Sequence, residues 1–318
     1  MVDLPVTGRT RSRRRRAVRL VLGLLAVALL LAALWQQRRG LVDALARLDV
    51  GVVLLSALFL LVGLTASMFG WRALLTAVGH RLPVLTAARL YFLTQIGKYL
   101  PGSIWPVIAQ IELGREEGVP AARSGIAAVL NLLVGIATGI VVGLVSLLLA
   151  NGSPGDYWWL LLPLPVLVLL VRPAVVQRVV GFVLRVLRKP APDVQLDSRG
   201  VLVATGWSVV MWLCFGLQVY VLVAAFGEPD AFARSVGAYA LAWVVGFVVF
   251  FAPAGAGARE LSLVVLLAPS LSRPEALSVA VVSRVLAVAG DLVVALGGIA
   301  AEKWHRHATG RRSVDRPG

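Results

Sequence analysis

Long apolar segments alternate with short polar ones along most of the chain. The longest apolar segments cover residues 18–35, 50–79, 122–150, 157–171, 200–226 and 275–300. A helix needs about 20 predominantly apolar residues to cross a hydrocarbon core of about 30 Å, so the pattern predicts about six full spans. The expected fold class is an all-α polytopic membrane protein.

Two further apolar regions, 84–114 and 236–268, are each interrupted by a proline and glycines, at 97–103 and 252–260. At about 1.5 Å per residue, the arms on either side of the first interruption are roughly 22 Å and 15 Å long. Neither arm comfortably crosses the membrane. We therefore expect two re-entrant helical hairpins. If each hairpin instead counts as two full spans, the orientation of the loops is unchanged.

Charge sets the expected orientation. The net charge is +15, and the basic residues gather in an N-terminal tail (1–17), a linker (172–199) and a C-terminal tail (301–318). Basic loops stay in the cytoplasm, which predicts a multi-pass protein of the plasma (inner) membrane with both termini cytoplasmic. The positive charge is accounted for by topology and anionic lipid heads, so no nucleic-acid partner is expected.

The two membrane halves, 18–171 and 200–300, have the same order of elements and are joined by the basic amphipathic linker 172–199. Each half has a span, a hairpin broken at a proline, and a long span. Loop charge predicts that the first hairpin enters from inside and the second from outside. This arrangement is an inverted-topology repeat, and in such folds the substrate site lies near the midplane at the broken helices.

The two breaks carry the candidate chemistry. A broken helix leaves backbone N–H groups free at the start of its second arm, near Ser103 and Ala258 here, and these ends attract anions. Lys98 and Arg259 add full positive charge, so a phosphate is the expected cargo group. Two alternatives stay open: Lys98 extends its amine to the membrane interface, or Arg259 and Glu260 form only a mutual ion pair.

Other polar residues within the apolar segments extend this candidate site. Arg284 and Asp291 lie seven residues apart in one span, and they pair either with each other or with Glu260. Asn131 occupies the corresponding place in the first half, where an interhelical hydrogen bond is the alternative. The complete set of candidate binding residues is Gln95, Lys98, Tyr99, Pro101, Gly102, Ser103, Trp105, Asn131, Pro253, Gly255, Gly257, Arg259, Glu260, Arg284 and Asp291.

The breaks also carry a resemblance. Lys98-Tyr99-Leu100-Pro101-Gly102-Ser103 with Trp105, and Pro253-Ala254-Gly255-Ala256-Gly257 with Arg259-Glu260, resemble the two signatures of the lysylphosphatidylglycerol synthase transmembrane family. The resemblance covers about residues 20–300 and implies a lipid flippase, here a stand-alone member without the aminoacyl-transferase domain. Leu130-Asn131 stands where the family pattern has an acidic-basic pair.

Together these features predict a flippase that moves an anionic phospholipid or a polyprenyl-phosphate-linked glycolipid between leaflets. Because the sequence holds no nucleophile set, nucleotide loop or metal signature, neither enzymatic activity nor a cofactor is expected. The alternatives are a membrane enzyme or accessory subunit acting on lipid-linked intermediates, and a small-solute secondary transporter. A separate lipid-modifying transferase is a possible partner, and the chain could form a homo-oligomer.

Overall fold

The computed structural model describes residues 42–43, 46–99, 105–150, 196–249 and 255–314. Within these ranges every regular element is a helix, as the apolar pattern predicted. The predicted spans 18–35 and 157–171 lie outside the described residues, as does nearly all of the linker 172–199.

Four of the described helices are long and apolar enough to cross a membrane. They are α3 (Val50–Ala77), α6 (Ala121–Ala150), α10 (Ser198–Ala224) and the first part of α13 (Arg273–Val314). Each coincides with a predicted span to within a few residues, although α13 continues as a helix into the region predicted as a C-terminal tail. The polar residue before a span sets its start: Asp49 and Asp197 each accept a hydrogen bond from a backbone N–H of the first turn.

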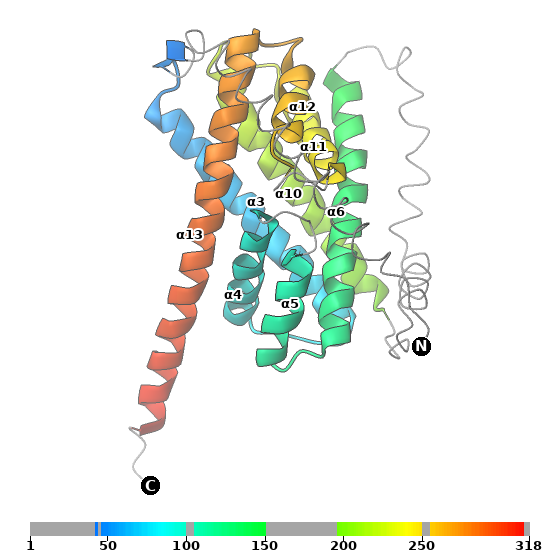
Figure 1. Ribbon diagram of the computed structural model, residues 1–318, viewed down its shortest axis with the longest axis vertical. Helices are drawn as coiled ribbons and strands as arrows, with labels where there is room; N and C mark the ends of the chain where they lie inside the picture. The colour runs from blue at the N-terminus through cyan, green and yellow to red at the C-terminus, as the bar shows by residue number, and fades with distance from the viewer. Residues whose placement is uncertain (1–41, 44–45, 100–104, 151–195, 250–254, 315–318) are drawn as a thin grey trace, which may run out of the picture.

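The remaining helices are short and come in two pairs. The first pair is α4 (Val84–Gln95), extended by the 3₁₀ turn η1 (Ile96–Tyr99), and α5 (Trp105–Glu116). The second pair is α11 (Phe232–Val248) and α12 (Ala258–Leu267). The members of each pair contact one another. In Figure 1 the α4–α5 hairpin occupies the lower half of the molecule and the α11–α12 hairpin the upper half, with both broken ends directed toward the middle.

The packing between the halves is reciprocal. The spans that precede the two hairpins, α3 and α10, pack along each other. The span that follows the first hairpin, α6, packs on α11, and the span that follows the second hairpin, α13, packs on α4. Small residues permit the close approaches: a Cβ on Gly298 of α13 would lie 3.1 Å from the backbone of Arg89 in α4. Each hairpin is thereby held by a span of the other half.

A buried polar chain joins three of the long helices. Ser283 of α13 donates to the Gln218 side-chain oxygen of α10 at 3.0 Å, and the Gln218 amide donates to Ser56 of α3 at the same distance. The Ser56 hydroxyl in turn donates to the backbone carbonyl of Gln218 at 2.9 Å. Because no water is available in hydrocarbon to replace these bonds, they fix how the three helices sit against each other.

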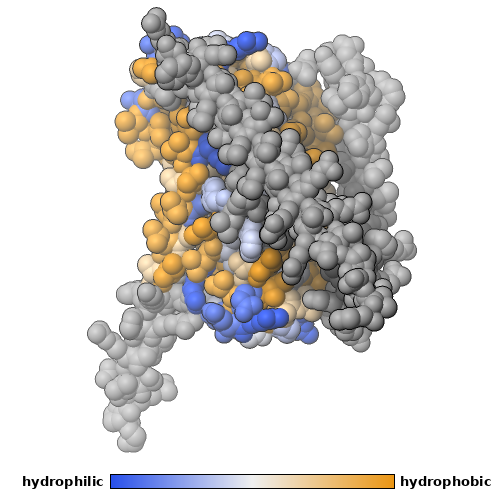
Figure 2. Space-filling view, viewed as in Figure 1, coloured by the Kyte–Doolittle hydropathy of each residue, from blue (hydrophilic) through white to orange (hydrophobic). Residues whose placement is uncertain are grey.

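The outer surface suits a lipid environment. Large apolar side chains are exposed on several helices, among them Leu54, Leu58, Leu202, Val265, Val285 and Leu296. On the face seen in Figure 2, the coloured surface is largely hydrophobic between hydrophilic ends. A soluble monomer rarely exposes so much contiguous apolar surface, so this part of the chain is membrane-embedded.

Candidate functional site

The tip of the first hairpin is a tight 3₁₀ turn that ends in Lys98 and Tyr99. It packs against the start of α5, where a Cβ on Gly97 would lie only 3.2 Å from the backbone nitrogen of Pro106. Glycine at this position therefore lets the two arms meet. The turn places both Lys98 and Tyr99 against Asp291 of α13.

The tip of the second hairpin depends on two glycines with positive φ. Gly255 has φ of +69° and Gly257 has φ of +85°, a backbone region that other residues rarely adopt. A Cβ on Gly255 would approach the Cα of Gly246 in α11 to 2.8 Å, so this position has no room for a side chain. The two glycines therefore let the chain enter α12 in close contact with α11.

The sequence predicted free backbone N–H groups at the start of α12, but one of these groups already has a partner. The Glu260 carboxylate accepts a hydrogen bond of 2.6 Å from the backbone N–H of Gly257. The helix therefore caps its own N-terminus with a carboxylate, in the manner of a capping box. The expectation that this end stands free for an anion was wrong for that N–H group, and the pattern Gly257-x-x-Glu260 could have signalled it.

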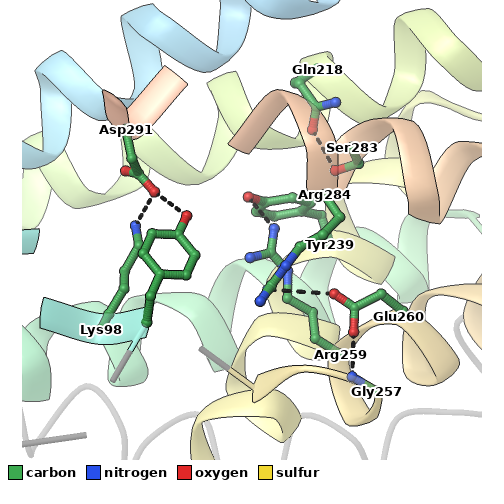
Figure 3. A network of polar contacts seen from close by, with 10 residues as sticks. Lys98, Gln218, Tyr239, Gly257, Arg259, Glu260, Ser283, Arg284 and Asp291 are labelled. Carbon is green, nitrogen blue, oxygen red and sulfur yellow. Dashed lines mark hydrogen bonds and ion pairs between the residues drawn. The ribbon is translucent and has the colours of Figure 1, made fainter. Parts of the chain in front are cut away.

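Two ion pairs tie α13 to the two hairpins (Figure 3). Lys98 Nζ lies 2.7 Å from Asp291 Oδ2, and the Tyr99 hydroxyl donates to the same oxygen at 2.5 Å. Arg284 Nη1 lies 3.4 Å from Glu260 Oε1. Both carboxylates are deeply buried, with Glu260 4% and Asp291 2% exposed. Of the two pairings left open for Arg284, the structure has the one with Glu260.

Arg259 is held differently from the other two cations. Its guanidinium donates to the Tyr239 hydroxyl at 2.6 Å and lies 4.7 Å from the centre of the Tyr239 ring. The mutual ion pair of Arg259 with Glu260 is absent, and no described carboxylate pairs with Arg259. The cluster of Lys98, Arg259 and Arg284 against Glu260 and Asp291 thus carries three positive and two negative charges, a net excess of one positive charge.

These residues border a cavity of about 220 Å³ between the hairpins and spans α3, α6, α10 and α13. The predicted residues that line it are Gln95, Lys98, Tyr99, Asn131, Gly255, Arg259 and Arg284. The tips of both hairpins therefore do border one space.

Other predicted residues lie elsewhere. Glu260, Asp291 and Gly257 are absent from the lining. The two carboxylates instead form ion pairs with the lining residues Arg284 and Lys98. Trp105 is also absent from the lining and is 42% exposed. Pro101, Gly102, Ser103 and Pro253 lie outside the described residues.

The cavity also contains residues that sequence reasoning missed. Tyr91 bonds Ser67 at 2.5 Å and lines the cavity together with Asn131. The Trp212 indole donates to Thr138 at 3.1 Å. Gln110, only 3% exposed, has a side-chain oxygen without a hydrogen-bond partner. A glutamine within a short apolar arm is the signal in the sequence that could have identified Gln110.

The fold and the cavity define an integral membrane protein whose helices surround a largely apolar cavity with three cationic side chains in its lining. The chain belongs to the family described as lysylphosphatidylglycerol synthase TM region, whose model matches residues 17–295. This match confirms the family suggested by the two breaks. Comparison with curated proteins finds no match.

Proposed function

We propose that this protein carries the head group of an anionic lipid across the membrane through the cavity between its two hairpins. The observation that carries the proposal is the excess of positive charge at that cavity, with Arg259 bound to a tyrosine rather than to a described carboxylate. A cation with no opposing charge in an apolar surrounding attracts an anion strongly, because the local dielectric is low. A phosphate group supplies such an anion, and arginine presents planar donors that match it.

The packing supports an inverted-topology repeat with re-entrant hairpins. The reciprocal contacts of α6 with α11 and of α13 with α4 are those expected if one half is related to the other by a two-fold axis in the membrane plane. In this arrangement the α4–α5 hairpin enters from the cytoplasmic side and the α11–α12 hairpin from the other side. The cavity then lies near the bilayer midplane, where a head group passing between leaflets meets its greatest barrier.

Transport rather than catalysis is the activity we assign, in the plasma membrane with both termini cytoplasmic. The polar groups of the site are engaged in ion pairs and hydrogen bonds between helices, an arrangement that suits a carrier with two states. A small-solute transporter would use the same cations, so the cargo must be tested in both lipid-linked and soluble form.

The direct test is movement of a fluorescent phosphatidylglycerol between the leaflets of proteoliposomes that contain the purified protein. Wild-type protein is expected to accelerate this movement, and Arg259→Gln is expected to slow it at least about tenfold, the equivalent of about 1.4 kcal/mol. Arg199→Gln is the matched control, because Arg199 is an exposed arginine at the start of α10 and is absent from the cavity lining. Equal rates for all three folded proteins would refute the role of Arg259.

A further inference from the structure

The charges at the cavity are arranged so that a ligand reaches the positive ones and not the negative ones. Lys98 and Arg284 line the cavity with 33% and 21% of their side chains exposed, and Arg259 lines it as a partly exposed residue. The carboxylates of Asp291 and Glu260 are almost completely buried and are absent from the lining. A ligand therefore meets three cations, with the two carboxylates behind them.

These charged side chains lie close enough together to act as one unit. Lys98 Nζ lies 5.6 Å and Arg284 Cζ 5.9 Å from the centre of the same Tyr99 ring, so cations from the first hairpin and from α13 converge there. The break segments 100–104 and 250–254 contain no ionisable residue in the sequence. The breaks therefore leave the excess of the unit at one positive charge.

The surroundings make this excess important. The rest of the lining is mainly apolar, and it includes Trp243 stacked on Phe247 with ring centres 5.7 Å apart. In such surroundings an uncompensated charge is costly. A head group with a single negative charge cancels the excess. A dianion leaves one negative charge over, and its cost of desolvation rises with the square of its charge, whereas its attraction to the site rises only in proportion.

A zwitterionic head group fits the same unit poorly. Its phosphate can meet the cations, but its ammonium group then needs a carboxylate within reach. The carboxylates of Asp291 and Glu260 are held by Lys98 and Arg284 and do not line the cavity. An ammonium group inside the cavity would therefore lie beside like charges without a partner.

From this balance we infer that the cavity selects head groups that carry a single negative charge, so that its cargo class is the phosphodiester monoanion. The inference deepens the proposed function and rests on it. The pairs Lys98–Asp291 and Arg284–Glu260 set the charge of the site, and Arg259 supplies the one positive charge that the cargo neutralises. Phosphomonoesters, diphosphates and zwitterionic head groups are disfavoured.

The test compares phosphatidylglycerol, phosphatidic acid and phosphatidylcholine in proteoliposomes of the wild-type protein. The three lipids carry the same fluorescent acyl chain, and the rates in protein-free vesicles are subtracted. At about pH 8.5 the phosphomonoester of phosphatidic acid is mostly a dianion, because its second pKa is about 6. Phosphatidylglycerol should then move at least about tenfold faster than either of the other lipids. A rate for phosphatidic acid or phosphatidylcholine equal to that of phosphatidylglycerol would overturn the inference.

A change of pH tests the charge of the cargo without any variant. At about pH 5 phosphatidic acid carries a single negative charge, whereas the charge of phosphatidylglycerol is the same as at the higher pH. The ratio of the two rates removes effects of pH that the protein imposes on both lipids. We expect phosphatidic acid to move within about twofold of phosphatidylglycerol at this pH. A ratio that stays the same at both pH values would contradict the inference.

One variant changes the charge of the site itself. Glu260→Gln keeps an oxygen that accepts from the Gly257 N–H group but removes a negative charge, so the excess becomes two positive charges. At about pH 8.5 the rate of phosphatidic acid relative to phosphatidylglycerol should rise about tenfold over the wild-type ratio. The wild-type ratio in folded Glu260→Gln would contradict the inference, and the two measurements on wild-type protein decide it if the variant does not fold.

Glu275→Gln is the matched control for this variant. Glu275 also accepts a bond from a backbone N–H at a helix start, that of Ser272 at 3.0 Å, and it also pairs with an arginine, Arg47, at 3.0 Å. Neither Glu275 nor Arg47 lines the cavity. The ratio of the two lipids should therefore stay at the wild-type value, and a shift as large as that in Glu260→Gln would contradict the assignment to the cavity.

Failure of the proposed function has a separate signature, read with two soluble phosphates. If folded wild-type protein moves no lipid but admits dimethyl phosphate faster than methyl phosphate at about pH 8.5, the protein is a solute transporter, and the selection of a single charge still holds. If it admits both solutes equally and moves no lipid, or moves neither lipid nor solute, both the proposed function and this inference are wrong.

Discussion

Arg284 and Asp291 lie seven residues apart on α13 and take their partners from different hairpins. Arg284 pairs with Glu260 at the tip of the α11–α12 hairpin, and Asp291 pairs with Lys98 at the tip of the α4–α5 hairpin. One helix therefore holds both hairpin tips by charges of opposite sign. An anion that enters the cavity competes with Glu260 and Asp291 for the same cations, so binding can loosen either tip. This competition offers a physical route from head-group binding to alternating access.

The pair of Lys98 with Asp291 gives a prediction about stability. Asp291→Asn leaves Lys98, which is only 33% exposed, without its carboxylate, and breaking a buried pair in this way costs about 3–5 kcal/mol. We expect a clear fall in the melting temperature of the purified protein. Lys98→Met should also destabilise, whereas the double variant Lys98→Met/Asp291→Asn should recover much of the loss because neither charge then remains unpaired. Additive losses in the double variant would mean that the two residues do not act as a pair.

The buried chain through Gln218 gives a second prediction. Gln218→Leu removes the acceptor of the Ser283 hydroxyl and the donor to Ser56, whose own bond to the backbone carbonyl of residue 218 is kept. The unpaired Ser283 hydroxyl should lower stability by about 1–3 kcal/mol. Thermal unfolding monitored by intrinsic tryptophan fluorescence measures the change. Thr65→Val serves as the control, because the Thr65 hydroxyl bonds only Leu61 of its own helix on an exposed face. A similar loss in both variants would show that Gln218 does not join the three helices as described.

The sharp turn at Gly255 gives a third prediction. Gly255→Ala must adopt a positive φ and bring a Cβ within 2.8 Å of Gly246, which should cost about 2–4 kcal/mol from backbone and packing strain together. We expect a lower melting temperature and slower lipid movement. Gly297→Ala on α13 meets nothing within 4 Å and should be neutral or slightly stabilising. A melting temperature in Gly255→Ala equal to that of wild type would contradict the close packing of α11 on the break.

The sequence predicted the helices well because their physical cause is local. Apolar length marked the described spans α3, α6, α10 and α13, and the proline-glycine breaks marked the ends of the short arms. The same breaks identified Lys98 and Arg259, since a charge inside an apolar segment is visible without any tertiary information. The α13 helix extends beyond its predicted end, because helix propensity rather than hydropathy determines how far a helix continues past the membrane.

The arrangement of partners could not be predicted in the same way. Arg284 had two plausible partners in the sequence, and the choice of Glu260 depends on how α12 packs on α13. The burial of Gln110 depends on the side of α5 that faces α6. Trp212 and Trp243 line the cavity with ring centres 5.2 Å apart. They come from a span and a hairpin arm, where aromatic residues are ordinarily interpreted as packing residues. Such details follow from tertiary contacts that no single segment encodes.

The central claim is that the lipid head group passes through the cavity between the hairpins, and filling the cavity tests it most directly. Gly135 on α6 lines the cavity, and a Cβ there would meet nothing within 4 Å, so Gly135→Phe should occupy the space without displacing the backbone. Gly206→Phe is the control, because Gly206 is exposed on α10 with equally free space and does not line the cavity. The account predicts that Gly135→Phe keeps the melting temperature of the wild type but loses movement of phosphatidylglycerol in proteoliposomes, while Gly206→Phe retains it. Movement at the wild-type rate in folded Gly135→Phe would contradict the account.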